Sequence, residues 1–199
     1  MSSADIHPEP QTTWDQAERA AEAGDHRELV LLLRRLHTMG QWRVAAQIGA
    51  MYELGGQGVD IQIDEALNWY RRAVFECDDP VAHLGLGRVH FSGWGATPKN
   101  LGLAKEHLLK AFEKGKPEAG VYLGLMYLYG HGVAKDIGAA ETYFIAAGNA
   151  EFPLAYRYLA IVLFLRREYR RGVAYLLRER WMRFKLWRQD RSHPNLWKL

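Results

Sequence analysis

The 199-residue chain contains a single cysteine, Cys77, which excludes an internal disulfide and any metal site built from several cysteines. A reducing compartment is consistent with this composition. The sequence also lacks a run of about 18 apolar residues, the length needed to cross a bilayer. Its first residues contain neither the basic nor the apolar segment of a secretory signal. We therefore expect a soluble, cytoplasmic protein.

The chain has little net charge, but the charge is unevenly distributed. Residues 166–199 contain eleven Lys and Arg against three Asp and Glu, a net charge of +8. Residues 1–165 contain fifteen basic and twenty acidic residues, a net charge of −5. The basic character therefore belongs to the C-terminal end, where a charge-dependent partner is one possible meaning.

What the sequence does have is an internal repeat. Gly49, Gly87 and Gly124 stand 38 and 37 residues apart, and each is followed six or seven residues later by a Gly-x-Gly motif. An alanine then precedes a pair of aromatic, histidine or leucine side chains. Self-similarity with this period is typical of repeat architectures. The repeat positions expected to be structural are Gly49, Tyr52, Gly58, Gly87, Gly95, Gly124, Tyr127, Gly130 and Gly132.

The repeated glycines predict helix pairs. A glycine inside a helix costs about 1 kcal/mol relative to alanine, so its recurrence indicates that a neighbouring element approaches closely there. The Gly-x-Gly pairs can adopt the positive φ angles that end one helix and turn the chain into the next. Each unit then has an apolar face that only its neighbours can bury. The predicted fold is all-α: a right-handed α/α solenoid of stacked helix pairs, with about five hairpins.

The repeat resembles that of the Sel-one-like repeat (SLR) family, relatives of the tetratricopeptide repeats with a longer, glycine-bearing loop. The third unit matches best, whereas the second has Ala96-Thr97-Pro98 and no acidic residue at the family's Asp position. The resemblance covers about residues 44–150. It implies a non-catalytic adaptor or scaffold that binds another protein or peptide in a concave groove, with no cofactor and no small-molecule substrate.

Both flanks of this region are expected to form degenerate, terminal units, because terminal repeats act as caps. Residues 1–12 are expected to be a disordered tail. The predicted divisions are hairpins at 13–40, 41–78, 80–115, 117–149 and 153–177, followed by a basic, Trp-rich capping helix or tail at 178–199.

The C-terminal stretch supports three interpretations. Leu177, Trp181, Phe184 and Trp187 are spaced as one helical stripe, which could cover the open end of the repeats. Basic residues interleaved with tryptophan can also lie on an anionic membrane or bind nucleic acid. The capping role is favoured. The candidates for a charged partner are Arg180, Trp181, Arg183, Lys185 and Arg188.

Arg88, Tyr122 and Tyr158 are the candidate partner-binding residues of the groove. Their repeat positions lie two before or one after the repeat glycine on the first helix of a pair. Tyrosine and arginine often anchor interfaces. A structural role inside the stack would suit each of them equally well.

Other chemistry finds little support. The Gly-x-Gly pairs lack the strand that precedes a nucleotide-binding loop. His83 and His90, seven residues apart, would be about 10 Å apart along a helix, too far to share an ion, and a packing role is favoured for them and for His107 and His131. Acidic neighbours should raise the pKa of the Cys77 thiol and disfavour it as a nucleophile. SLR proteins credited with hydrolase activity are cysteine-rich and exported, so an enzyme is the last choice.

Overall fold

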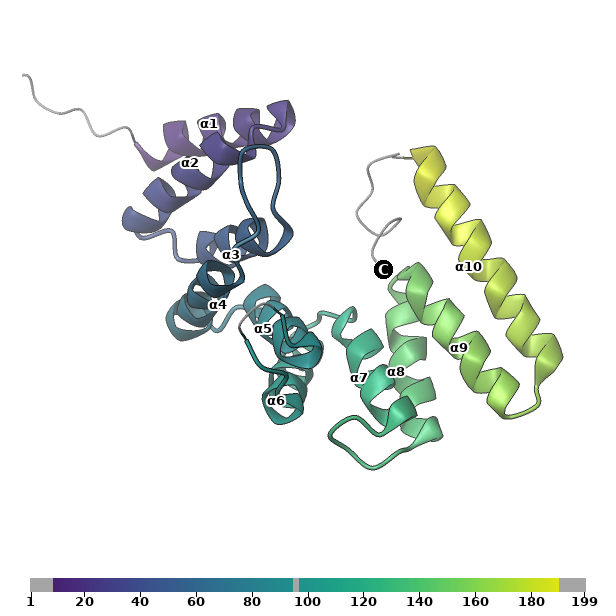
Figure 1. Ribbon diagram of the computed structural model, residues 1–199. Coiled ribbons are helices and arrows are strands. Elements are labelled where there is room, and N and C mark those ends of the chain that lie inside the picture. Colours follow the sequence, from purple (N-terminus) through teal and green to yellow (C-terminus); the bar gives the residue numbers. More distant parts are fainter. Residues whose placement is uncertain (1–8, 95–96, 190–199) are drawn as a thin grey trace, which may run out of the picture. The chain divides into compact units, whose positions relative to one another are not determined.

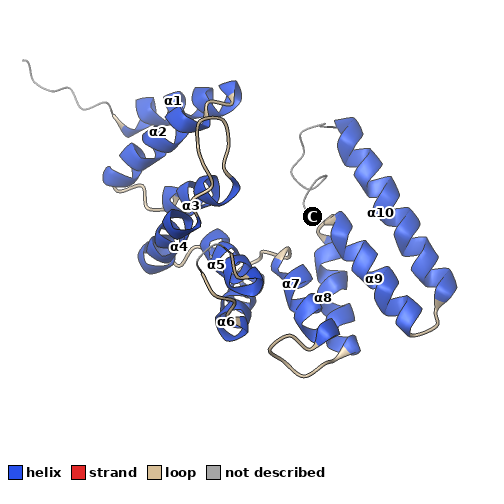
Figure 2. Ribbon diagram, in the orientation of Figure 1, coloured by secondary structure: helices blue, strands red, loops and turns tan. Residues whose placement is uncertain are grey.

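The computed structural model describes residues 9–94 and 97–189, and within them it contains ten helices and no strand (Figures 1 and 2). The chain divides into two compact units, residues 1–99 and 100–199, each described by itself. In unit 1, each helix packs against the next in the chain, and α3 also contacts α5. The helices of unit 1 are α1 (Pro10–Ala23), α2 (His26–Thr38), α3 (Val44–Leu54), α4 (Ile63–Cys77) and α5 (Pro80–Ser92).

Unit 2 repeats the arrangement: each helix packs against the next in the chain, and α7 also contacts α9. Its helices are α6 (Leu101–Glu113), α7 (Ala119–Tyr129), α8 (Ile137–Asn149), α9 (Pro153–Leu165) and α10 (Tyr169–Gln189). The prediction of an all-α fold made of helix pairs is confirmed.

Several helices begin where the sequence supplies a side-chain cap or a proline. The Asp136 side chain accepts a hydrogen bond from the Ala139 amide at 3.0 Å, the role expected of the family's Asp position. In the second repeat Asn100 does the same for the Leu103 amide at 3.1 Å. The missing acidic residue of that repeat is therefore replaced by an equally good cap.

Helix α1 begins at Pro10, three residues before the predicted start of the first hairpin. Proline suits the first helical position because its fixed φ matches the helix and it has no amide hydrogen to leave unpaired. The expectation of disorder is therefore wrong for residues 10–12, and residues 1–8 lie outside the described residues.

The long loops close in the same way in the first and third repeats. The Gln62 amide donates to the Tyr52 carbonyl at 2.8 Å, and the Asp136 amide donates to the Tyr127 carbonyl at 2.9 Å. Gly58, Gly130 and Gly132 have φ between +71° and +76°, as a chain reversal directly after a helix requires. The predicted turn role of these glycines is confirmed, while Gly95 lies outside the described residues.

The repeat glycines leave room for aromatic rings. A methyl carbon added to Gly49 on α3 would lie 2.7 Å from the ring of Tyr70, and one added to Gly85 on α5 would lie 2.4 Å from the same ring. In unit 2, a methyl carbon on Gly124 would lie 2.5 Å from Phe144. At Gly49 and Gly124 the predicted close approach is thus made by an aromatic side chain of the second helix of the same pair, and Gly85 approaches the ring of the preceding pair.

Helix α10 is continuous across residue 178, where the sequence analysis placed the start of a separate capping segment. Nothing near this point interrupts a helix, because residues 173–189 contain neither glycine nor proline. The second helix of the last hairpin and the Trp-rich segment up to Gln189 therefore form one element. Residues 190–199 lie outside the described residues.

Candidate interaction surfaces

A hollow of about 670 Å³ lies in unit 1, between α2 and α4. Helix α2 contributes three lining residues, the turn after it contributes Trp42, and α4 contributes four. Trp42 is 47% exposed although it is among the largest side chains of the unit. The lining residues are Arg34, His37, Thr38, Trp42, Glu65, Asn68, Trp69 and Arg72.

Aromatic rings and guanidinium groups organise this hollow around Trp69. The guanidinium carbons of Arg34 and Arg72 lie 5.5 and 5.6 Å from the centre of the Trp69 ring, within cation–π range. The His37 ring meets both tryptophans edge-on, with ring centres 5.3 Å from Trp42 and 5.2 Å from Trp69. The hollow therefore offers apolar ring surface beside two positive charges.

Glu76 holds His37 and Arg72 in place. Its carboxylate lies 2.7 Å from Nε2 of His37, and it accepts a hydrogen bond from Nε of Arg72 at 2.8 Å. Partial burial by itself would raise the pKa of Glu76, but the hydrogen bonds from Arg72 and His37 outweigh it and hold that pKa below its ordinary value. Glu76 is therefore ionised at neutral pH, and two walls of the hollow are fixed before any partner arrives.

This hollow could not be identified from the sequence. Trp69 belongs to the aromatic pair of the first repeat, and Arg34, Trp42 and Arg72 belong to three different segments of the chain. Only the packing of α2 against α3 and of α3 against α4 brings them together. The available signal was Trp42, a tryptophan in a turn, where a large apolar side chain has no core to enter.

Arg88, a predicted partner-binding residue, is engaged in a buried polar network in unit 1. Its guanidinium pairs with the carboxylate of Glu53, which is only 2% exposed. The Tyr70 hydroxyl donates to the same carboxylate at 2.6 Å. Burial, followed by the charge of Glu53, raises the pKa of Tyr70. The network joins α3, α4 and α5, so the geometry favours a structural role for Arg88.

Tyr122 and Tyr158, the other two predicted partner-binding residues, lie on α7 and α9 of unit 2, and both are half-buried. Tyr158 stacks on Phe144 with ring centres 5.2 Å apart, and burial raises the pKa of its phenol. Their role in partner binding stays a prediction, with packing as the observed contribution of Tyr158.

Helix α10 has two apolar faces. On one face, Tyr175, Met182 and Leu186 pack against α9. The α9 side chains in this cluster are Tyr156, Leu159 and Val162. The predicted stripe points the other way, and Leu177, Trp181, Phe184 and Trp187 are all 43–62% exposed. The expectation that this stripe covers the repeats is therefore wrong. Met182 and Leu186, at the same helical spacing, provide that cover instead.

The five charged-partner candidates differ in their surroundings. Arg183 donates to Glu179 at 3.3 Å, and Lys185 donates to Glu151 at 3.0 Å and lies 5.9 Å from the centre of the Trp181 ring. Arg180 and Arg188 are exposed. No helix among the described residues combines the length and hydropathy needed to span a membrane.

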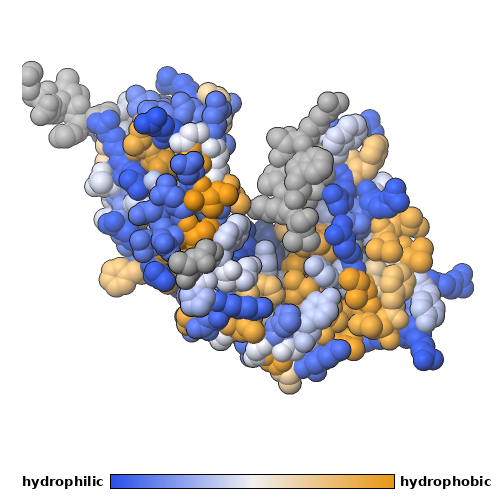
Figure 3. Space-filling view, in the orientation of Figure 1, coloured by the Kyte–Doolittle hydropathy of each residue, from blue (hydrophilic) through white to orange (hydrophobic). Residues whose placement is uncertain are grey.

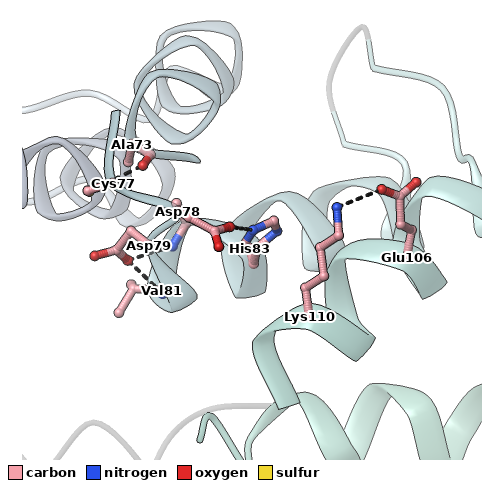
Figure 4. A network of polar contacts seen from close by, with 9 residues as sticks. Ala73, Cys77, Asp78, Asp79, Val81, His83, Glu106 and Lys110 are labelled. Atoms are coloured by element: carbon pink, nitrogen blue, oxygen red, sulfur yellow. Dashed lines mark hydrogen bonds and ion pairs between the residues drawn. The ribbon is translucent and has the colours of Figure 1, made fainter. Parts of the chain in front are cut away.

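The histidines and the cysteine have local partners. Nε2 of His83 lies 2.8 Å from Asp78, and Asp79 caps α5 by accepting from the Val81 and Ala82 amides at 2.7 and 3.1 Å (Figure 4). Burial, with Asp79 and Glu76, raises the pKa of the Cys77 thiol, the direction predicted from its neighbours. In residues 9–94 and 97–189, no three His, Cys, Asp or Glu side chains are grouped to hold a metal ion.

Helix pairs joined by glycine loops, with small helix residues set against aromatic rings, define an all-α repeat protein of the solenoid class. The chain belongs to the Sel1 repeat family, whose repeat matches residues 38–74, 80–116 and 117–152. The middle repeat contains α5 of unit 1 and α6 of unit 2.

Two sequence relatives contain matching segments. The chain is 31% identical over 146 residues to chitin synthase regulatory factor 3 of Schizosaccharomyces pombe, covering 71% of this chain and 15% of that protein. It is 34% identical over 91 residues to the ERAD-associated E3 ubiquitin-protein ligase component HRD3B of Arabidopsis thaliana, covering 46% of this chain and 14% of that protein. The chain thus spans about 15% of the length of these relatives.

Solved structures show the same fold. A Sel1 repeat protein from Oxalobacter formigenes superposes with a TM-score of 0.70 at 24% identity, over 87% of this chain and 73% of that one. A protective antigen of uropathogenic Escherichia coli with an SLR fold gives 0.71 at 18% identity, over 89% of this chain and 40% of that one. The predicted family and fold class are confirmed.

Proposed function

We propose that this chain is a non-catalytic scaffold that binds another protein, and that the hollow around Trp69 in unit 1 is a recognition surface. Membership in the Sel1 repeat family supports the first part, since such repeats commonly mediate protein interactions. Two relatives are named as a ligase component and a regulatory factor, which are parts of larger systems. We place the protein in the cytoplasm as part of the same proposal.

The observation that carries the second part is the exposed ring of Trp42, which packs on a fixed histidine and lines the same hollow as two arginines. Tryptophan and arginine are enriched among the residues that dominate binding energy. The aromatic walls suit an apolar or aromatic side chain, and Arg34 suits a neighbouring carboxylate because its ion pair with Glu65 is long at 3.9 Å and exposed. The partner is therefore a peptide segment with an apolar side chain beside Asp or Glu.

Selection of peptides from a random display library against the full chain tests this. We expect enrichment of an aromatic or large aliphatic residue next to Asp or Glu. Trp42→Ala should weaken binding of a selected peptide by about thirtyfold or more, since truncating a central aromatic residue typically removes about 2 kcal/mol or more. Arg34→Ala should have a smaller effect.

Phe75 provides the matched control, because it is an aromatic residue of unit 1 that is 91% exposed and does not line the hollow. Phe75→Ala should leave peptide binding unchanged. If Trp42→Ala and Phe75→Ala had equal effects, the hollow would not be the recognition surface.

The predicted groove residues remain a second candidate surface. Tyr122→Ala should then reduce recovery of partners in an affinity purification, whereas unchanged recovery would count against Tyr122. Arg88→Ala is a poorer probe because it leaves the buried Glu53 carboxylate without its cation, and a loss of stability would follow whether or not Arg88 touches a partner.

A further inference from the structure

The outward face of α10 carries an ordered apolar stripe. Its members recur every three or four residues, which places them on one side of the helix. Each is between 50% and 62% exposed. The stripe consists of Tyr169, Val173, Leu177, Trp181 and Phe184. In Figure 3, apolar surface is visible over α9 and α10, interrupted by hydrophilic side chains.

This face does not have the composition of a solvent-facing cap. A terminal repeat that ends in water needs a polar outer surface to remain soluble. The side chains required to cover α9 are already supplied by the opposite face of the same helix, through Tyr175, Met182 and Leu186. Among the described residues of unit 2, the outward stripe is thus not used for packing, and its regular spacing indicates a second contact.

The charges of α10 identify the kind of surface it would meet. The helix contains seven Arg and Lys and one acidic residue, Glu179. Glu179 is buried against α9, where Arg157 donates to it at 2.9 Å. The exposed arginines Arg170, Arg180 and Arg188 lie on the same side as the stripe. The outward face therefore combines bulky apolar side chains with positive charge only.

We propose that the outward face of α10 docks on an anionic lipid surface, with the stripe in the boundary between headgroups and acyl chains. Basic residues beside Trp, Phe and Leu are the composition of helices that lie in this interface. Arginine side chains can keep their charged ends at the headgroups while their stems cover apolar surface. Basic residues that lie close to a membrane surface are attracted to its acidic lipids. This docking is independent of the hollow in unit 1.

Two other occupants fit the face less well. A second copy of the chain would bring two strongly basic helices together, and like charges disfavour such an isologous contact. Single-stranded RNA would use the basic residues and stack on Trp181, but Val173 and Leu177, in the middle of the stripe, offer it neither charge nor a ring.

Co-flotation of the full chain with vesicles tests the proposal. One set is pure phosphatidylcholine and the other is phosphatidylcholine mixed with phosphatidylserine, each at low and raised salt. We expect binding to the acidic vesicles that weakens with salt, because exposed charges are screened. Leu177→Ser with Phe184→Ser should lower partitioning by about tenfold or more, as should Arg180→Glu with Arg188→Glu.

Matched controls keep the test specific. Phe75→Ser, which alters an exposed ring of unit 1, and Arg19→Glu with Arg71→Glu, which reverses two exposed charges there, should leave partitioning within about twofold, because neither alters the stripe or its arginines. Circular dichroism should be the same for all variants, since every substituted side chain is exposed.

Five results would overturn the proposal. The first three are equal binding of wild-type chain to both vesicle sets, binding to neither set, and flotation of the α10 variants like wild type. The fourth is binding of a labelled oligouridine as tightly as the acidic vesicles, with loss in the same variants, which would assign the face to RNA. The fifth is a dimer in light scattering that only the α10 variants dissociate, which would assign the face to a second copy.

Discussion

Helices α8 and α10 occupy equivalent places in unit 2, each as the second helix of a hairpin, yet they solve different packing problems. Helix α8 packs against both α7 and α9 and buries Ala140, Phe144, Ala147 and Gly148. Among its large apolar side chains only Ile145 is exposed, at 41%. Among the described helices, α10 packs mainly against α9, and it exposes a full apolar stripe.

The difference shows how a repeat helix responds to its neighbours. With helices on both sides, α8 uses small residues so that two partners can approach it. With one neighbour, α10 uses small and buried residues on the inner side only and is free to carry bulky residues outside. If solvent were the only environment of that outer side, polar residues would be expected there. The bulky apolar residues on the outer side of α10 instead indicate a second partner.

The largest expected contrast is between two phenylalanines. Phe144→Ala should destabilise the protein by about 3–5 kcal/mol, because it opens a cavity in a fully buried site. Phe184→Ala on α10 should change the free energy of unfolding by about 0.5 kcal/mol or less, as is usual for exposed positions. Urea unfolding monitored by circular dichroism measures both. Similar losses would mean that the outer stripe is part of a core after all.

Helices α8 and α10 each have a glycine on the side that faces α9. A methyl carbon on Gly148 of α8 would lie 2.9 Å from Tyr156, and one on Gly172 of α10 would lie 2.4 Å from Phe164. Substitution of either by alanine should cost about 1–3 kcal/mol through overpacking. Gly102→Ala is the control, because the methyl group meets only Asn100 at 3.5 Å and should stabilise α6 by about 0.5–1 kcal/mol. A stabilised Gly172→Ala variant would show that α10 packs less closely than α8.

Ion pairs of α10 should show the same gradient from inside to outside. Glu179→Ala removes a buried acceptor of Arg157 and Arg183 and should cost about 1 kcal/mol, because both arginines can still reach water. Glu151→Ala removes the exposed partner of Lys185 and should cost about 0.5 kcal/mol or less. Double-mutant cycles of the Arg157–Glu179 and Lys185–Glu151 pairs measure the difference in coupling energy. Equal coupling energies would contradict the inward orientation of Glu179.

Much of the fold could be predicted from the sequence because the same glycine pattern occurs in three repeats. Gly49 and Gly124 indicated a close approach, and the Gly-x-Gly motifs indicated the turns. The partner at the close approach, the ring of Tyr70 or Phe144, required coordinates because the period does not say which side chain of the next helix enters the gap.

The surfaces were harder to predict, for two physical reasons. In α10, Met182 and Leu186 are four residues apart, as are Leu177 and Trp181, so periodicity alone cannot decide which set faces α9. In the hollow of unit 1, Arg34, Trp42 and Trp69 come from separate segments that only helix packing brings together. Arg88 was predicted to bind a partner, but its charge is paired with the carboxylate of Glu53, which is far away in the sequence and adjacent in the fold.

The pairing of Glu53 with Arg88 makes neighbouring repeats unequal and so limits how they could be shuffled. Four residues after their own repeat glycines, where the first repeat has Glu53, the second and third have Phe91 and Leu128. Leu125 stands where Arg88 stands. A chimaera that placed the third repeat directly after the first would set a buried carboxylate opposite an aliphatic side chain. The buried Glu53–Arg88 pair therefore fixes the order of these two repeats.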